Sequence, residues 1–135
     1  MKPTIEEIQK VANLLGEKIG APRSLLIVKY RSPEDGSPHV EIKPEGFDYV
    51  CSERCYEIYR KHTTSLDELL YWIVSDVAFR LASDYELANR ISGVDSRRLL
   101  FSEYISIIDR VSEDWKKKAS DEVEQILTGA PYSDE

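Results

Sequence analysis

The chain has 135 residues, of which 41% are hydrophobic and 32% charged, a balance typical of one globular domain and unlike that of disordered or fibrous chains. The net charge of −7 comes entirely from residues 65–135, with fifteen acids and eight bases, because residues 1–64 hold ten of each. An acidic half repels a phosphate backbone, so we expect no direct nucleic-acid binding. The same charge either favours a basic partner or only maintains solubility.

The sequence predicts a cytoplasmic protein with no membrane contact. The opening "MKPTIEEIQK" has acids where a secretory signal needs an apolar core, and the longest apolar run, "LLYWIV", is too short to cross a bilayer. Cys51 and Cys55 should therefore remain reduced. They could join His39 and His62 as zinc ligands, but a strand through both cysteines and the lack of a paired histidine motif argue against it. We predict no metal and no cofactor.

Residues 3–63 are predicted to form a helix and a sheet. Apolar residues at helical spacing predict an amphipathic helix over residues 3–19, ended by Gly20 and Pro22. Turn residues in "SPEDGSP" and "PEG" separate runs with the composition of strands. These runs are residues 24–31, 39–43 and 47–52. Residues 54–63 fit the spacing of a strand or of a helix, and we favour a short fourth strand.

Residues 65–128 are predicted to be helical. Ser65 and Glu68 have the spacing of a capping box, which starts a helix that runs from about residue 66 to about residue 90. Together with the early strands, this predicts an α+β fold: an N-terminal helix, an antiparallel sheet of three or four short strands, and three packed C-terminal helices. We expect residues 1–135 to form a single domain.

Two further helices follow the long one. Asp95 or Ser96 can cap the first of them, and Ser112 starts the second, which Gly129 and then Pro131 end. The inward-facing residues predicted for the last helix are Trp115, Ala119, Val123, Ile126 and Leu127. The closing "PYSDE" has no such pattern, and we predict that it is loose.

The long helix places charge on an apolar face. On a helical wheel Asp84 falls in the middle of that face, and Arg80 falls near its edge, four residues away. We expect a buried structural ion pair, because an unpaired carboxylate would be costly there. Alternatively, the two residues line the pocket of a small enzyme or ligand-binding domain.

The opposite side of this helix carries Trp72 and Phe79, with the i,i+4 pair Glu86 and Arg90 beside them. The two aromatic residues either pack inside the fold or form an exposed patch suited to a protein partner. Because charged side chains lie beside the two aromatic residues, this side of the helix is a candidate binding surface.

The corner after the long helix is rich in charge. Gly93 can relax the backbone there, and Asp95 can cap the next helix. Arg97 and Arg98 lie within reach of acids across the turn. We therefore predict an ionic clasp that holds two helices at a fixed angle.

No catalytic constellation is visible. Asp84 and Glu86 project about 200° apart on a helix, so they cannot flank one substrate bond. His39 and His62 belong to no nucleophile motif, and there is no glycine-rich phosphate loop. We predict that the protein is not an enzyme.

A spaced set of residues carries a family resemblance: Tyr85, Glu86, Arg90, Gly93, Asp95, Arg97, Arg98 and Phe101. Together with "LLYW", "SER-YE", "DW" and "EVEQIL", this set resembles the Immunity protein 63 family of bacterial polymorphic toxin systems, from about residue 24 to the C terminus. At the position of Cys55 the family often has glycine, which affects the local turn. The resemblance implies a small cytoplasmic antitoxin that binds a cognate toxin and blocks it stoichiometrically, without catalysis.

We therefore predict toxin neutralisation by protein–protein interaction, with a basic toxin as partner. A general protein-interaction module would use the same surface, and the sequence leaves the oligomeric state open. The candidate partner-binding or family-signature residues are Trp72, Phe79, Asp84, Glu86, Arg90, Asp95, Arg97 and Arg98.

Overall fold

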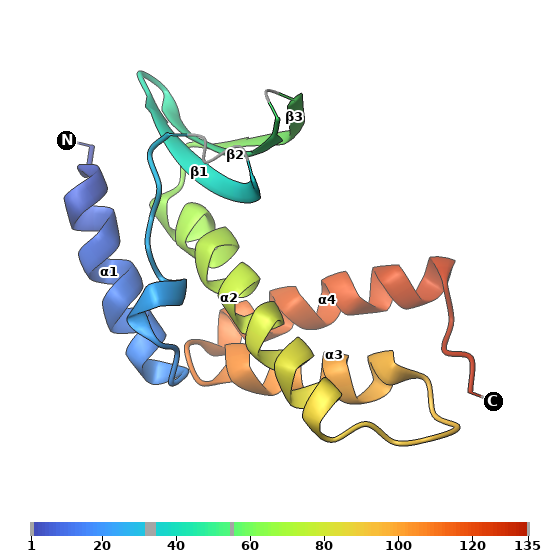
Figure 1. Ribbon diagram of the computed structural model, residues 1–135. Coiled ribbons are helices and arrows are strands. Elements are labelled where there is room, and N and C mark those ends of the chain that lie inside the picture. Colours follow the sequence, from blue (N-terminus) through green and yellow to red (C-terminus); the bar gives the residue numbers. More distant parts are fainter. Residues whose placement is uncertain (1, 32–34, 55, 135) are drawn as a thin grey trace. The chain divides into compact units, whose positions relative to one another are not determined.

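The computed structural model describes residues 2–31, 35–54 and 56–134 (Figure 1). Its elements are, in chain order, α1 (Ile5–Lys18), the 3-10 turn η1 (Arg23–Leu25), β1 (Asp35–Lys43), β2 (Gly46–Glu53), β3 (Tyr56–Thr63), α2 (Leu66–Ala88), α3 (Ser96–Asp109) and α4 (Glu113–Gly129). The predicted α+β fold, with an N-terminal helix, an antiparallel sheet and three C-terminal helices, is confirmed. Among the helices of the described residues, none combines the length and apolar character that crossing a bilayer requires.

The chain forms two compact units, each with its own internal contacts. The first consists of Met1–Gly16 and Pro22–Val74, and the second of Glu17–Ala21 and Ser75–Glu135. The helix α2 contributes its first part to one unit and its second part to the other. That the whole chain is a single domain stays a prediction.

The sheet of the first unit has β2 at its centre. β1 and β3 pair with β2 on either side, both antiparallel, with Val40 opposite Tyr49 and Tyr49 opposite Lys61. Every residue of β2 except its last, Glu53, is buried. β3 is almost fully exposed. The strand predicted for residues 54–63 is confirmed, whereas β1 begins earlier than predicted, within the expected turn.

The strand predicted for residues 24–31 is wrong. The segment begins with η1 and continues without regular secondary structure, and Leu26 and Val28 are buried in it, so the alternation of the sequence is real. A side chain takes the place of a partner strand: the Gln9 amide donates to the Leu26 carbonyl and accepts from the Val28 N–H, both at 2.7 Å. Beyond it, the Lys29 carbonyl accepts a bond from Val40 N at 2.7 Å.

Replacing Gln9 with alanine should destabilise the fold by about 1–2 kcal/mol, because two backbone groups beside buried side chains lose their partner. Urea unfolding followed by circular dichroism measures this. Gln125→Ala, at an exposed position of α4, is the matched control and should change the free energy of unfolding by less than about 0.5 kcal/mol. Equal effects of the two substitutions would contradict this role of Gln9.

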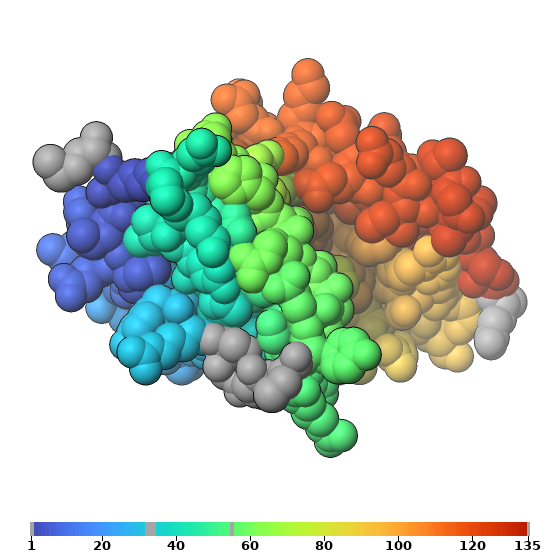
Figure 2. All heavy atoms as spheres, turned by 90° about the horizontal axis from the view of Figure 1, so that it is seen from above, coloured from blue at the N-terminus to red at the C-terminus, as the bar shows by residue number. Residues whose placement is uncertain are grey.

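In the second unit α3 and α4 lie side by side, as Figures 1 and 2 both show. Ser112 starts α4, as predicted, and the Ser112 hydroxyl caps this helix by accepting from the Trp115 N–H at 3.2 Å. Trp115, Ala119 and Val123 are buried, which also agrees with the prediction. Ile126 was predicted to face inward but is 49% exposed. It lies in the last turn of α4, where the buried stripe ends.

Candidate functional site

The second part of α2 buries a different face from the one predicted. Ala78, Ala82 and Glu86, spaced four residues apart, are buried. Arg80 and Asp84 form an ion pair, with 3.5 Å between Nε and Oδ2, but their side chains are 63% and 61% exposed. Asp84 was predicted to be buried, and that prediction is wrong. A hydropathy wheel favours large apolar residues over alanine, whereas the second part of α2 buries Ala78 and Ala82.

Glu86 is the buried carboxylate of this helix. Its side chain is only 4% exposed, and it accepts two bonds from Arg90, at 2.8 Å from Nη2 and 3.1 Å from Nε. The guanidinium of Arg90 lowers the pKa of Glu86 from its usual value. The predicted i,i+4 pair is therefore formed, and its carboxylate is ionised at neutral pH.

The corner between α2 and α3 depends on one glycine and one cap. Gly93 has φ +79°, a left-handed conformation that glycine adopts without a steric penalty. Asp95 is the N-cap of α3, and its Oδ1 accepts from the Arg97 N–H at 3.0 Å. The Arg97 side chain, followed by the backbone N–H groups of Ser133 and Arg97, holds the pKa of Asp95 well below its usual range.

The C-terminal tail, predicted to be loose, is bound to this corner instead. Arg97 donates to the carbonyls of Ala130 and Pro131, both at 2.8 Å. Asp134 accepts from Arg98 Nε at 3.0 Å and from the Asp95 N–H at 2.7 Å. Figure 1 shows the tail descending from α4 toward the loop before α3. Arg97 and Arg98 do form an ionic clasp, but it joins the start of α3 to the tail and not, as predicted, two helices to each other.

An aromatic ring completes this clasp. The guanidinium carbon of Arg98 lies 4.3 Å from the centre of the Tyr132 ring, a cation–π distance. The Tyr132 ring also packs on Phe101 at 6.5 Å between centroids. Ser133 N–H donates to Asp95 Oδ2 at 2.9 Å. The tail is thus held by polar and aromatic contacts together.

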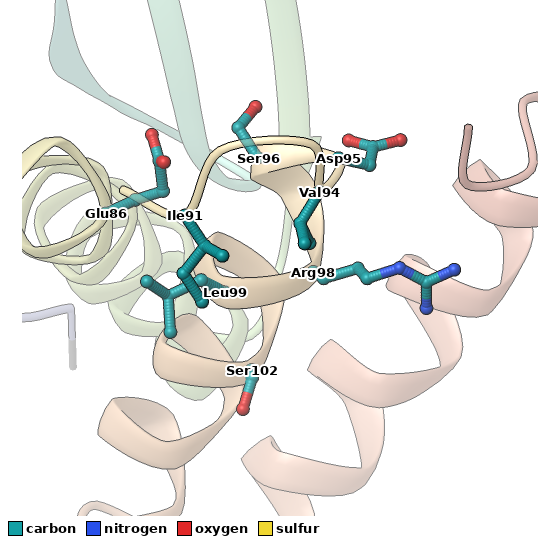
Figure 3. Close-up of a pocket in the computed structure, with 8 residues that line it drawn as sticks. All are labelled: Glu86, Ile91, Val94, Asp95, Ser96, Arg98, Leu99 and Ser102. Carbon is teal, nitrogen blue, oxygen red and sulfur yellow. The ribbon is translucent and has the colours of Figure 1, made fainter. Parts of the chain in front are cut away.

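The corner also contains a cavity of about 310 Å³ (Figure 3). Its lining residues are Glu86, Ile91, Val94, Asp95, Ser96, Arg98, Leu99 and Ser102. Three predicted site residues, Glu86, Asp95 and Arg98, therefore meet at one place. In Figure 3 the Arg98 guanidinium points away from Ile91 and Leu99, so the aliphatic side chains dominate the interior. A cavity of this size can receive a side chain or a small ligand.

The two predicted aromatic residues have different environments. Trp72, in the first unit, stacks on Tyr49 at 6.1 Å, and the Lys61 ammonium lies 4.8 Å from the Trp72 ring centre. It is half-buried in these contacts. Phe79, in the second unit, is 46% exposed and meets Tyr104 edge to face at 5.9 Å. Of the two, Phe79 is the more accessible to a partner.

The carboxyl groups of the corner should make the free energy of unfolding depend on pH in the acidic range. The pKa values of Glu86, Asp95 and Asp134 are all lowered in the folded chain. Such groups stabilise the fold above their unfolded pKa, near 4, and this contribution is lost as the pH falls below it. We expect Asp95→Asn, which keeps a capping side chain, to weaken the dependence of unfolding on pH between about 4 and 2. Urea unfolding at pH 7, 4 and 3 measures this; identical pH dependence in both proteins would contradict it.

A second cluster of charged side chains lies on one face of the sheet in the first unit. Arg60 bonds to Asp48 at 2.7 Å and to Glu41 at 2.9 Å, and His62 Nδ1 lies 2.6 Å from Asp48 Oδ1. The side chains of Arg60 and Lys43 lower the pKa of Glu41 most strongly. These groups satisfy one another, which is the pattern of a structural network.

The four residues considered as zinc ligands include one, Cys55, that lies outside the described residues. Cys51 Sγ lies 2.8 Å from the Gly36 carbonyl, and His39 and His62 lie beside Glu41 and Asp48 respectively. Within the described ranges no group of three or more His, Cys, Asp or Glu side chains could hold a metal ion.

Sequence reasoning missed the residues that complete the corner. The cavity is lined by Ile91, which is 55% exposed, and by Val94 and Leu99, and none of the three is among the predicted site residues. The contacts of Tyr132 and Asp134 join positions more than thirty residues apart along the chain. Local periodicity contains no signal for such pairs.

The comparisons with known proteins identify one family. The family model described as Immunity protein 63 matches residues 43–125, a range that includes every predicted site residue but not the tail. The match is narrower than the resemblance that we inferred from the sequence. No curated protein and no solved structure matches the chain. The chain belongs to the Immunity protein 63 family and is an immunity protein of a toxin system.

Proposed function

We propose that the protein binds its cognate toxin directly and blocks it stoichiometrically, without catalysis, through the surface around the α2–α3 corner. The observation that carries this proposal is the family match, because an immunity protein implies a toxin partner. The matched range contains the whole corner from Glu86 to Arg98. Residues that the family pattern includes thus surround an open cavity.

The chemistry of this surface supports a protein partner. Large apolar side chains are exposed along the second part of α2 and the loop after it. They are Phe79, Tyr85, Leu87, Ile91 and Val94. Apolar groups ringed by charged residues are typical of protein-binding surfaces. The acid excess of residues 65–135 favours a basic toxin, since opposite charge speeds encounter.

The alternative pocket around Arg80 and Asp84 has little support. Both side chains are more than half exposed, and they pair with each other across 3.5 Å. An exposed i,i+4 pair is ordinary helix surface. A general protein-interaction module would use the same apolar residues and differ only in its partner.

Co-expression with the toxin tests the proposal. The candidate to test is a toxin encoded by the gene beside the one that encodes this chain, expressed from a separate promoter in a host that the toxin poisons. We expect this protein to restore growth and to co-purify with the toxin in a one-to-one complex. Failure to rescue while the protein accumulates in soluble form would reject the assignment to that toxin.

A further inference from the structure

The corner cavity combines an aliphatic interior with one ionised wall. Ile91, Val94 and Leu99 supply the apolar side chains, and Glu86 supplies a carboxylate that is almost fully buried. An apolar cavity binds apolar groups, whereas a carboxylate in its lining favours a group with positive charge. The two together fit a group with an aliphatic stem and a cationic end.

The Glu86 carboxylate has acceptor positions left for such a cation. A carboxylate offers about four lone-pair positions. Within the described part of the chain, the hydrogen bonds to Glu86 are the two from Arg90. Arg90 is itself 58% exposed, so solvent reaches the cationic partner of this pair. A purely apolar occupant would cut the remaining positions off from water, which is costly for an ionised group.

The other charged groups of the cavity are already engaged. Asp95 accepts bonds from Arg97 and from Ser133 N–H. Arg98 is bound to Asp134, and its guanidinium points away from the interior (Figure 3). Glu86 is therefore the carboxylate best placed to meet an incoming donor.

We propose that this cavity receives a lysine or arginine side chain of the toxin, with its aliphatic stem against Ile91, Val94 and Leu99 and its cationic end on Glu86. This inference rests on the proposed function, since it names the group by which the toxin would anchor. The acidic character of residues 65–135 draws basic groups toward this half of the chain. Long basic side chains bury their stems while they keep the charged end at a polar rim.

A pair of small probes tests the cavity without any toxin. n-Butylguanidinium carries the stem and the cation, and n-butylurea has nearly the same shape without the charge. Titration of the isotopically labelled full chain, followed by NMR, should move the amide signals of Ile91, Val94 and Leu99. We expect millimolar binding of n-butylguanidinium and binding of n-butylurea that is at least about tenfold weaker.

Matched variants separate charge from packing. Glu86→Gln should remove the preference for the cation, whereas Glu124→Gln, at an exposed acid on α4, should leave it unchanged. Ile91→Ala, at an exposed position that tolerates substitution, should weaken both probes several-fold. It keeps the test valid if Glu86→Gln fails to fold.

Three outcomes would overturn the inference: equal binding of the two probes, signal changes spread over acids outside the corner, or no binding of either probe. Rescue of poisoned cells is measured separately. Rescue without probe binding would leave the proposed function standing and remove only the anchor. Probe binding without rescue would leave a cavity that binds cations and remove its assignment to a side chain of that toxin.

Discussion

Leu87→Arg should abolish rescue of toxin-poisoned cells and weaken toxin binding at least about a hundredfold. Leu87 is 64% exposed beside the corner, so the change leaves the core intact. An arginine there removes an apolar contact and places a positive charge against a basic partner, where it would lose water without gaining a counter-ion. Growth rescue and calorimetric titration with the purified toxin measure the two effects.

Leu14→Arg is the matched control. Leu14 is 62% exposed, as a leucine on a helix, but it belongs to α1 of the first unit. It should rescue as well as the unchanged chain. Loss of rescue in both variants, or in Leu14→Arg alone, would contradict the assignment of the binding surface to the α2–α3 corner.

Deletion of residues 131–135 should lower the melting temperature by roughly 10 °C. The deletion removes the Pro131 carbonyl that Arg97 binds and the Asp134 carboxylate that binds Arg98 and the Asp95 N–H. Bonds that involve charged groups are stronger than neutral ones, and here several are lost together with the packing of an aromatic ring. Thermal unfolding followed by circular dichroism measures the change.

A pair of arginine variants checks that the clasp is responsible. Arg98→Ala should lower the melting temperature by a few degrees, because Asp134 and Tyr132 lose their partner. Arg110→Ala, at the exposed C-cap of α3, should change it little. An unchanged melting temperature for Arg98→Ala combined with weaker toxin binding would place Arg98 in the interface instead of the clasp.

The helices and their ends were predictable because their causes are local. The capping residues Ser65, Asp95 and Ser112 act on backbone groups two or three residues away, and the structure places all three as predicted. The i,i+4 pairs of α2 follow from helix geometry alone. The strands at residues 39–43 and 47–52 could also be predicted from local features, namely their composition and the turn residues that separate them.

The failures share one cause, which is competition between partners distant in the chain. Residues 24–31 have the alternation of a strand, but the Gln9 side chain takes the backbone bonds that a ladder would use. Asp84 was predicted to be buried, but Glu86 is buried instead, because the covered face of α2 is the one that carries Ala78 and Ala82. A helical wheel does not show which face a neighbouring element covers.

The sequence by itself determined the fold class, the helix caps, the acidic second half and the resemblance that the family match confirmed. These depend on composition, on neighbours within one turn, and on spacing along the chain. Only the tertiary structure decided that the tail is bound to Arg97 and Arg98, and that Glu86 faces a cavity beside Ile91. Such contacts form when distant segments fold together, and their free energy is invisible to any local pattern.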